Sequence, residues 1–100
     1  MREGSVEAAV RREVRALGGV CWKWVSPGRA GVPDRICIFP GGRVVFVELK
    51  RPDVADGRSP QQKKVAGILR RLGCEVWLIN SAAVFHARLI EAGIVENDLF

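Results

Sequence analysis

Long apolar runs are absent from this sequence, and so are the paired cysteines of zinc sites and disulfide frameworks. No apolar stretch approaches the roughly 20 residues that span a membrane, and the N-terminal "MREGSVEAAVRREVRALGG" has no uninterrupted apolar core. Cys21, Cys37 and Cys74 lie far apart, and none belongs to a CxxC pair. We therefore expect reduced, buried thiols in a cytoplasmic protein, either bacterial or phage-encoded or otherwise intracellular, without a membrane partner.

The composition is that of one globular domain spanning 1–100, with 48% apolar and 27% charged residues. The net charge is +5 and arginine supplies most of the positive side. The planar guanidinium fork suits phosphate, so the excess favours a nucleic-acid partner, while a solvated basic surface remains the alternative. A chain this short buries a limited fraction of its surface, which makes a homodimer a reasonable expectation.

Hydrophobic periodicity predicts helices and strands in the order α-β-β-β-α-β-α. The predicted helices cover 5–18, 60–72 and 81–92, and the predicted strands cover 20–25, 34–39, 43–50 and 74–80. A helix between the last two strands requires that those strands be parallel neighbours. The sequence therefore predicts an α/β fold.

The loop Pro40-Gly41-Gly42 is typical of a tight β-hairpin. It pairs Phe39 with Arg43, and the same register places Asp34 opposite Glu48, with both carboxylates on one face. Both faces of the two strands are otherwise apolar, so we expect covering elements on both sides of the sheet.

Asp34, Glu48 and Lys50 put charge at the open end of this hairpin, away from its loop. A buried charge costs several kcal/mol unless it is paired or bound to a metal. Two converging carboxylates suit a hard cation, Mg²⁺ or Mn²⁺, and the backbone carbonyl of Leu49 is a further candidate ligand. Lys50 is then a candidate to orient or deprotonate a water, or to stabilise the charge that develops on phosphorus. A strand-end salt bridge between Lys50 and the acids is the alternative.

Three short segments, "GVPD" (31–34), "VELK" (47–50) and "SPQQ" (59–62), stand in an order that resembles one known family. With Glu7 in the first helix and the small-residue loop 26–31 ahead of Asp34, the chain resembles the VRR-NUC (virus-type replication–repair nuclease) domain of the PD-(D/E)XK nucleases. A lone E-x-K is weak evidence, whereas the ordered set covers nearly the whole chain.

The resemblance implies a restriction-endonuclease-like α-β-β-β-α-β core, with a mixed central sheet flanked by helices. It implies an enzyme, an Mg²⁺- or Mn²⁺-dependent endonuclease that hydrolyses DNA phosphodiester bonds. Stand-alone domains of this kind look like homodimeric, structure-selective enzymes of Holliday-junction-resolvase type, with branched or structured DNA as the partner in repair, recombination or replication. The alternative function is a non-catalytic nucleic-acid-binding module with the same fold.

The resemblance also assigns roles to two residues that have ordinary structural explanations. Glu7 is placed near the metal, directly or through water, although a glutamate in a first helical turn also favours the helix dipole. Gln62 is placed at the catalytic site, although Ser59-x-x-Gln62 is a capping box on its own. The predicted catalytic set is Asp34, Glu48, Lys50, Gln62 and Glu7.

Candidate DNA contacts lie on the first strand, in the glycine-rich loop and after the third strand: Lys23, Ser26, Arg29 and Arg51. For the loop that holds Ser26 and Arg29, a merely flexible connection is the alternative. Trp22 and Trp24 alternate with Lys23, so at least one of them is expected to pack in the core. The single histidine, His86, is assigned no role. The apolar C-terminal residues Ile94, Val95, Leu99 and Phe100 are a candidate dimer surface.

Overall fold

The computed structural model describes residues 4–51 and 56–96 of the 100-residue chain. Its elements are α1 (Gly4–Ala16), β1 (Val20–Lys23), β2 (Arg35–Phe39), β3 (Arg43–Leu49), α2 (Pro60–Arg71), β4 (Glu75–Ile79) and α3 (Ala82–Glu91). The predicted order of elements is confirmed, and the boundaries differ by one or two residues at most ends. The first strand ends at Lys23, two residues earlier than predicted.

The strands form a mixed sheet in the order β1-β2-β3-β4. The β1/β2 and β2/β3 pairs are antiparallel, and β3/β4 is the parallel pair that the crossover through α2 requires. Phe39 pairs with Arg43, as the three-residue loop predicts, and the ladder continues to Arg35 opposite Val47. Asp34 and Glu48 occupy the next positions along this register, at the open end of the hairpin, away from its loop.

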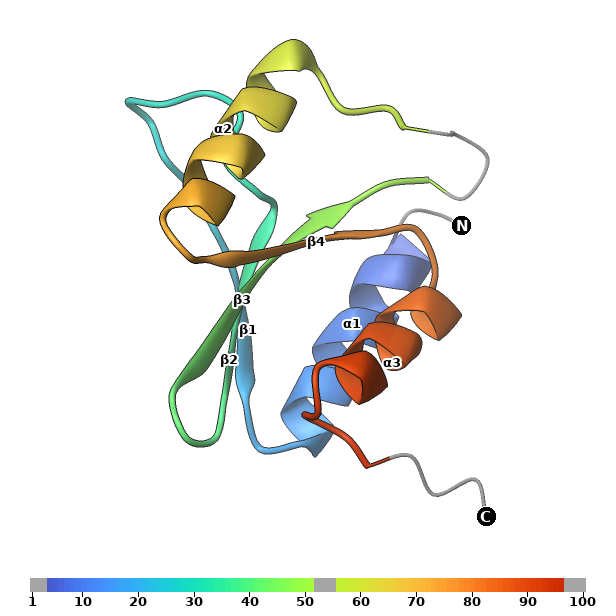
Figure 1. Cartoon of the computed structure of the whole chain (residues 1–100). Helices are drawn as coiled ribbons and strands as arrows, with labels where there is room; N and C mark the ends of the chain where they lie inside the picture. Colours follow the sequence, from blue (N-terminus) through green and yellow to red (C-terminus); the bar gives the residue numbers. More distant parts are fainter. Residues whose placement is uncertain (1–3, 52–55, 97–100) are drawn as a thin grey trace.

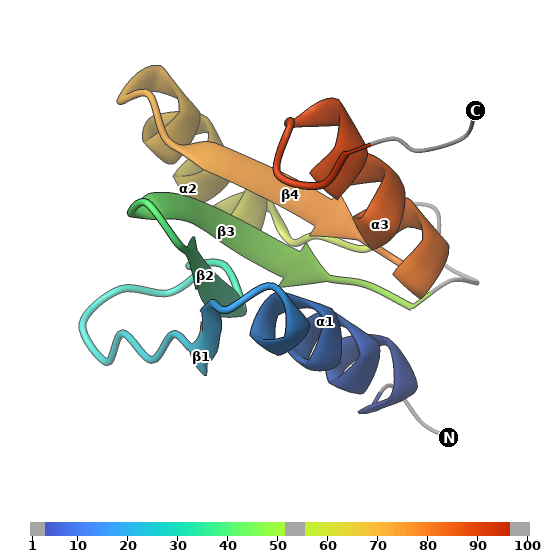
Figure 2. The same cartoon turned by 90° about the horizontal axis from the view of Figure 1, so that it is seen from below.

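Helices α1 and α3 lie side by side on one face of the sheet, and α2 lies on the other face (Figures 1 and 2). The α1/α3 face holds the main core, made of alternate strand residues and one stripe from each helix. Its buried members are Val10, Val14, Cys37, Phe39, Val45, Val47, Trp77, Ile79, Phe85 and Leu89. Trp77 and Phe85 meet edge to face, with ring centroids 5.9 Å apart.

The α2 face of the sheet is covered only in part, which corrects the expectation of cover on both sides. Val44 is 38% exposed, and Trp22 on the edge strand β1 is 60% exposed. Trp24, by contrast, packs against Phe46 with ring centroids 5.2 Å apart, so one of the two tryptophans is a packing residue as expected. The apolar pattern of a strand indicates which face each residue occupies, but the extent of cover depends on how far α2 reaches.

The C-terminal segment corrects part of the expected dimer surface. Ile94 and Val95 are partly buried against the chain's own core. Leu99 and Phe100 lie outside the described residues. Among the residues that the structure describes, no helix has the length and apolarity needed to cross a membrane.

Candidate active site

The candidate site lies where β3 ends and where α2 begins on the neighbouring face of the sheet (Figure 1). Asp34 comes directly before β2, and Glu48 is the penultimate residue of β3. Since β2 and β3 are antiparallel, the start of one strand meets the end of the other. The hairpin geometry thus brings together two carboxylates that are 14 positions apart in the sequence.

Asp34 is fixed by backbone hydrogen bonds from both neighbouring segments. The amide N–H of Leu49 donates to Asp34 Oδ2 at 2.7 Å. The amide N–H of Trp24 donates to the Asp34 carbonyl at 3.0 Å, which continues the pairing of the first two strands past Lys23. These contacts hold the carboxylate against the end of β3.

Glu48 is the buried polar residue of the described core, with 0% of its surface exposed. Neither of its carboxylate oxygens has a hydrogen-bond partner. Arg58 Nη1 lies 3.9 Å from Glu48 Oε2, at the outer limit of an ion pair. Burial raises the pKa of Glu48, and the negative charge of Asp34 adds to this, while Arg58 and Lys50 oppose it.

These two carboxylates fit a hard divalent cation. A buried carboxylate without hydrogen bonds is costly in the absence of a ligand, and a cation next to Asp34 and Glu48 would offset that cost. No cluster of three or more His, Cys, Asp or Glu side chains occurs within residues 4–51 and 56–96. A cation here would therefore have few protein ligands and keep several waters, as Mg²⁺ commonly does.

Lys50 and Gln62 are joined by a hydrogen bond from Lys50 Nζ to Gln62 Oε1, at 3.0 Å. Gln62 is also the N3 residue of a capping box: its Oε1 accepts from the Ser59 amide at 2.9 Å, and its own amide donates to Ser59 Oγ at 3.1 Å. The two explanations of Gln62 are compatible in this geometry. The start of α2 thereby sets the position of the lysine.

Gly31 fits the loop before Asp34 tightly against the start of α2. Its φ is +91°, and a Cβ atom there would lie 2.7 Å from the backbone of Gln61. A left-handed conformation and a close backbone approach both favour glycine. This close contact packs the loop before Asp34 against the first turn of α2.

Glu7 lies beside the site but is already paired. Its Oε2 accepts from Arg35, at 2.7 Å from Nε and 2.6 Å from Nη2. Glu7 also lines an open pocket of about 380 Å³, together with Lys23, Asp34 and Leu49. Direct ligation of a cation by Glu7 would compete with Arg35, whereas a contact through water would leave the ion pair intact.

The predicted DNA contacts occupy different places. Lys23 lines the same pocket as Asp34. Ser26 and Arg29 form a turn, in which the Arg29 amide donates to the Ser26 carbonyl at 3.1 Å, and neither lines that pocket. Arg29 and Arg51 are both exposed.

The sequence analysis did not identify two residues that lie near the carboxylates. Arg58 falls in the polar connection before α2, where nothing in the sequence pattern separates it from ordinary loop residues. Its Nε also donates to Asp56 Oδ1 at 3.0 Å. The hydrogen bonds from Arg58 hold the pKa of the Asp56 carboxyl well below its usual range. Arg35 opens β2 next to Asp34, and a cation inside an apolar strand was a usable signal.

The fold and the paired carboxylates at the strand end define a class, the α/β nuclease domains of the restriction-endonuclease-like type. One solved structure, a "VRR_NUC domain", matches with a TM-score of 0.78 and 32% sequence identity, over 89% of this chain and 94% of that one. A curated protein of Acyrthosiphon pisum secondary endosymbiont phage 1, named "Putative nuclease p44", is 42% identical over 81 residues, which cover 81% of this chain and 85% of the relative. No family model matches the chain. The chain belongs to the VRR-NUC family.

Proposed function

We propose that this protein is a divalent-metal-dependent DNA endonuclease that selects branched or structured DNA, in the manner of a Holliday-junction resolvase. The observation that carries the proposal is the buried Glu48 carboxylate, which has no hydrogen-bond partner and lies next to Asp34. In a member of the VRR-NUC family, this unsatisfied group is best explained by a bound cation and substrate.

Asp34, Glu48 and the carbonyl of Leu49 would hold Mg²⁺ or Mn²⁺, with Glu7 contributing through water. When bound, the cation would polarise the scissile phosphate and acidify a water ligand. The remaining work belongs to the chain's own side chains. The Asp34 carboxylate is preorganised by the Leu49 amide, so little reorganisation is needed on binding.

Lys50 is the proposed general base, acting as a neutral amine, or electrostatic stabiliser, acting as an ammonium ion. Its Nζ can donate three hydrogen bonds, and Gln62 Oε1 accepts one of them. The other two remain available to a water molecule or a phosphate oxygen. By fixing the ammonium group, Gln62 acts as a positioning residue in this scheme.

Four residues are the proposed contacts to the DNA backbone: Lys23, which lines the pocket that contains Asp34, and Ser26, Arg29 and Arg51, which lie outside its lining. Such contacts position a duplex without reading its sequence. Binding by this set should therefore weaken steeply with salt, since each neutralised phosphate releases counterions.

A homodimer is proposed because two sites related by a two-fold axis can make paired incisions in a branched substrate. The partly covered sheet face, with Val20, Trp22 and Val44, is the apolar surface that we assign to the partner copy. Light scattering should give twice the chain mass. Trp22→Arg should halve that mass without unfolding the protein, and a dimer unaffected by this change would place the interface elsewhere.

The function is tested by cleavage of labelled four-way junction, flap, duplex and single-stranded DNA with Mg²⁺, Mn²⁺ or EDTA. The proposal requires metal-dependent cutting that falls by about 10²–10⁴-fold in Glu48→Ala and in Lys50→Ala. Glu75→Gln is the matched control, because Glu75 has its own arginine partner at the other end of the sheet. Absence of cutting with every metal, with DNA binding intact, would identify a non-catalytic binding module instead.

A further inference from the structure

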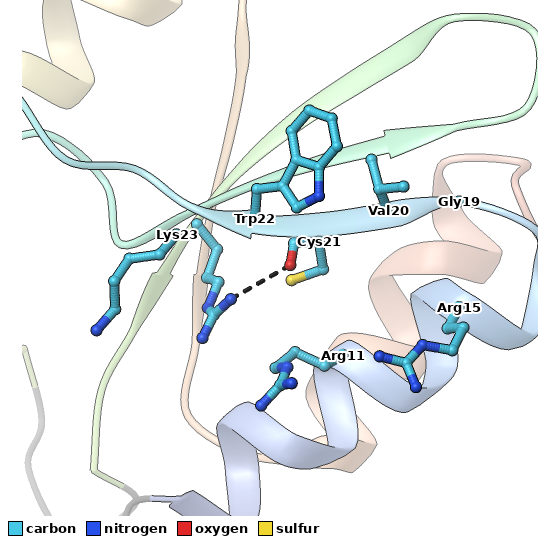
Figure 3. Close-up of a pocket in the computed structure, with 8 residues that line it drawn as sticks. Arg11, Arg15, Gly19, Val20, Cys21, Trp22 and Lys23 are labelled. Atoms are coloured by element: carbon cyan, nitrogen blue, oxygen red, sulfur yellow. Dashed lines mark hydrogen bonds between the residues drawn. The ribbon is translucent and has the colours of Figure 1, made fainter.

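A second open pocket, of about 340 Å³, lies between α1 and β1 (Figure 3). Four cationic side chains line it, with no acidic residue in the lining: Arg11, Arg15, Lys23 and Arg35. Arg11 and Arg15 extend from α1 toward the strand, and Cys21 extends from β1 toward them. The concentration of positive charge around one hollow suits an anion.

Most of this charge is not compensated within residues 4–51 and 56–96. Arg35 is held by Glu7 and donates to the Cys21 carbonyl at 3.2 Å. Arg11, Arg15 and Lys23 make no ion pair or hydrogen bond with the described part of the chain, and all three are exposed. Arg11 and Arg15 are also four residues apart on a helix, a spacing at which like charges destabilise the helix by about 0.2–0.5 kcal/mol. Folding alone does not explain why these cations face one hollow.

The pocket adjoins the candidate active site through one shared lining residue. Lys23 lines both this pocket and the one that contains Asp34. Glu7, Arg11 and Arg15 follow one another at four-residue intervals on α1. Arg11 therefore lies about 6 Å along the helix axis from Glu7, and Arg15 lies about 6 Å beyond Arg11. The positive charge therefore forms a line that begins beside Asp34 and leads away from it.

We propose that this pocket, hereafter the arginine pocket, binds the phosphates of the DNA strand that continues from the scissile phosphate. The inference rests on the proposed nuclease function for its ligand, DNA, and it adds Arg11 and Arg15 as binding residues. Guanidinium groups form charge-assisted and often bidentate hydrogen bonds with phosphate oxygens, which an open pocket lined by arginine can accept. The contacts are to the backbone, so they contribute affinity and strand direction but no base preference.

Cys21 provides a reporter inside the pocket. Its thiol lies 3.6 Å from that of Cys37, its directly paired neighbour on β2. The hydrogen bond from Cys37 lowers the pKa of Cys21, and the charges of Arg35 and Arg11 lower it further. Cys37 is fully buried, whereas Cys74 is partly exposed and does not line this pocket. Alkylation of Cys21 relative to Cys74 therefore measures access to the pocket.

The first test measures DNA binding in a Glu48→Gln background, which blocks cutting. Arg11→Gln/Arg15→Gln should weaken binding by at least tenfold at low salt and reduce the slope of log K against log [salt] by about 1.5–2, as expected for two lost phosphate contacts. Arg12→Gln/Arg71→Gln removes the same charge from exposed positions outside the pocket and should change binding by less than threefold. Arg11→Lys/Arg15→Lys should restore most of the salt slope.

The second test uses the unmodified chain, with the DNA substrate bound in EDTA. DNA should slow alkylation of Cys21 by at least fivefold and leave Cys74 within twofold, as measured by mass spectrometry of the labelled peptides. Equal protection of the two thiols, or none at Cys21, would overturn the pocket as a DNA site. The same conclusion would follow if the Arg11/Arg15 variant bound like its charge-matched control.

Failure of the nuclease function gives a different result. If the wild-type chain never cuts DNA but the arginine variants lose binding and Cys21 is protected, the arginine pocket is supported as a DNA site and the nuclease function is overturned. If wild type cuts DNA and the arginine variants match their control in KM and kcat, the nuclease function is supported and the arginine pocket is overturned as a DNA site. If both the nuclease function and the pocket assignment are correct, Arg11→Gln/Arg15→Gln should have a higher KM than wild type, with kcat within threefold.

Discussion

Two arginine–glutamate pairs mark opposite ends of strand β3. At the hairpin end, Arg43 binds Glu75 through two hydrogen bonds of 2.9 and 3.1 Å, with side chains that are 40% and 36% exposed. At the other end, Arg58 lies 3.9 Å from Glu48, whose side chain is 1% exposed and accepts no hydrogen bond. The exposed pair therefore has two hydrogen bonds of normal length, whereas the buried pair has none.

The difference separates a pair that the fold completes from a pair that a ligand must complete. Exposed ion pairs contribute little to stability, and they can be lost or gained without consequence for the core. A buried charge with an incomplete partner is destabilising, so it persists where binding or catalysis requires it. The comparison supports the Glu48 end as the proposed functional end of the sheet, and the predictions below test that division with variants at the two ends.

The largest effect is expected for Gly31→Ala against Gly41→Ala. Both glycines have φ of +91°, so both variants share a backbone strain of about 1–2 kcal/mol. At Gly41 nothing lies within 4 Å of the new Cβ, whereas at Gly31 it would meet the Gln61 backbone at 2.7 Å. Urea unfolding should show Gly31→Ala to be less stable than Gly41→Ala by about 1–3 kcal/mol, with a loss of cleavage that Gly41→Ala does not share. Equal losses would mean that the loop is not clamped against α2.

The second prediction concerns Glu48→Gln in EDTA. The buried ionised carboxylate costs stability in the metal-free chain, so the neutral amide should raise the free energy of unfolding at pH 7 by about 1–3 kcal/mol. Because the folded-state pKa of Glu48 is raised, wild type loses stability as the pH rises through that pKa. Below about pH 4 the carboxyl is protonated in both the folded and the unfolded state, so the stability gained by Glu48→Gln should vanish there. Added Mg²⁺ should stabilise wild type and not the variant. A destabilised variant would make Arg58–Glu48 an ordinary structural pair.

The sequence was sufficient for the parts of this comparison that depend on local rules. The Pro40-Gly41-Gly42 loop fixes the β2/β3 register, and with it the proximity of Asp34 and Glu48. The start of α2 follows from Ser59 and Pro60. What could not be predicted depends on how elements dock: the Glu7–Arg35 pair requires the position of α1 on the sheet, and no local pattern supplies it.

The pairing of Cys21 with Cys37 was missed for a related reason. An 11-residue loop separates β1 from β2, and a loop of that length does not set a register, unlike a tight hairpin. Arg58 lies in a polar connection, and its contact with Glu48 depends on the path of the chain into α2, which the local sequence does not indicate. Long-range docking thus supplies the charges around the two carboxylates, while local sequence supplies the carboxylates themselves.

A third prediction separates the capping role of Gln62 from its contact with Lys50. Ser59→Ala and Gln62→Ala each remove half of the capping box and should cost a similar amount of stability, about 0.5–2 kcal/mol. Gln62→Ala alone also removes the acceptor for Lys50 Nζ. Single-turnover cleavage should therefore be about tenfold slower in Gln62→Ala than in Ser59→Ala, which corresponds to about 1.4 kcal/mol. Equal rates would reduce Gln62 to a helix cap.

The smallest effect is expected at the hairpin end, for Glu75→Gln. This change removes the carboxylate that Arg43 binds, and Arg43 keeps its 2.6 Å hydrogen bond to the carbonyl of Ala92 at the end of α3. Thermal melts should show a shift in Tm at low ionic strength that is smaller than that of any preceding variant and is lost in 1 M salt, where exposed charges are screened. Cleavage should be unchanged. A loss of activity, or a Tm shift that survives high salt, would show that the hairpin end is coupled to the carboxylates at the far end of β3, and the two pairs could then no longer be divided into structural and functional.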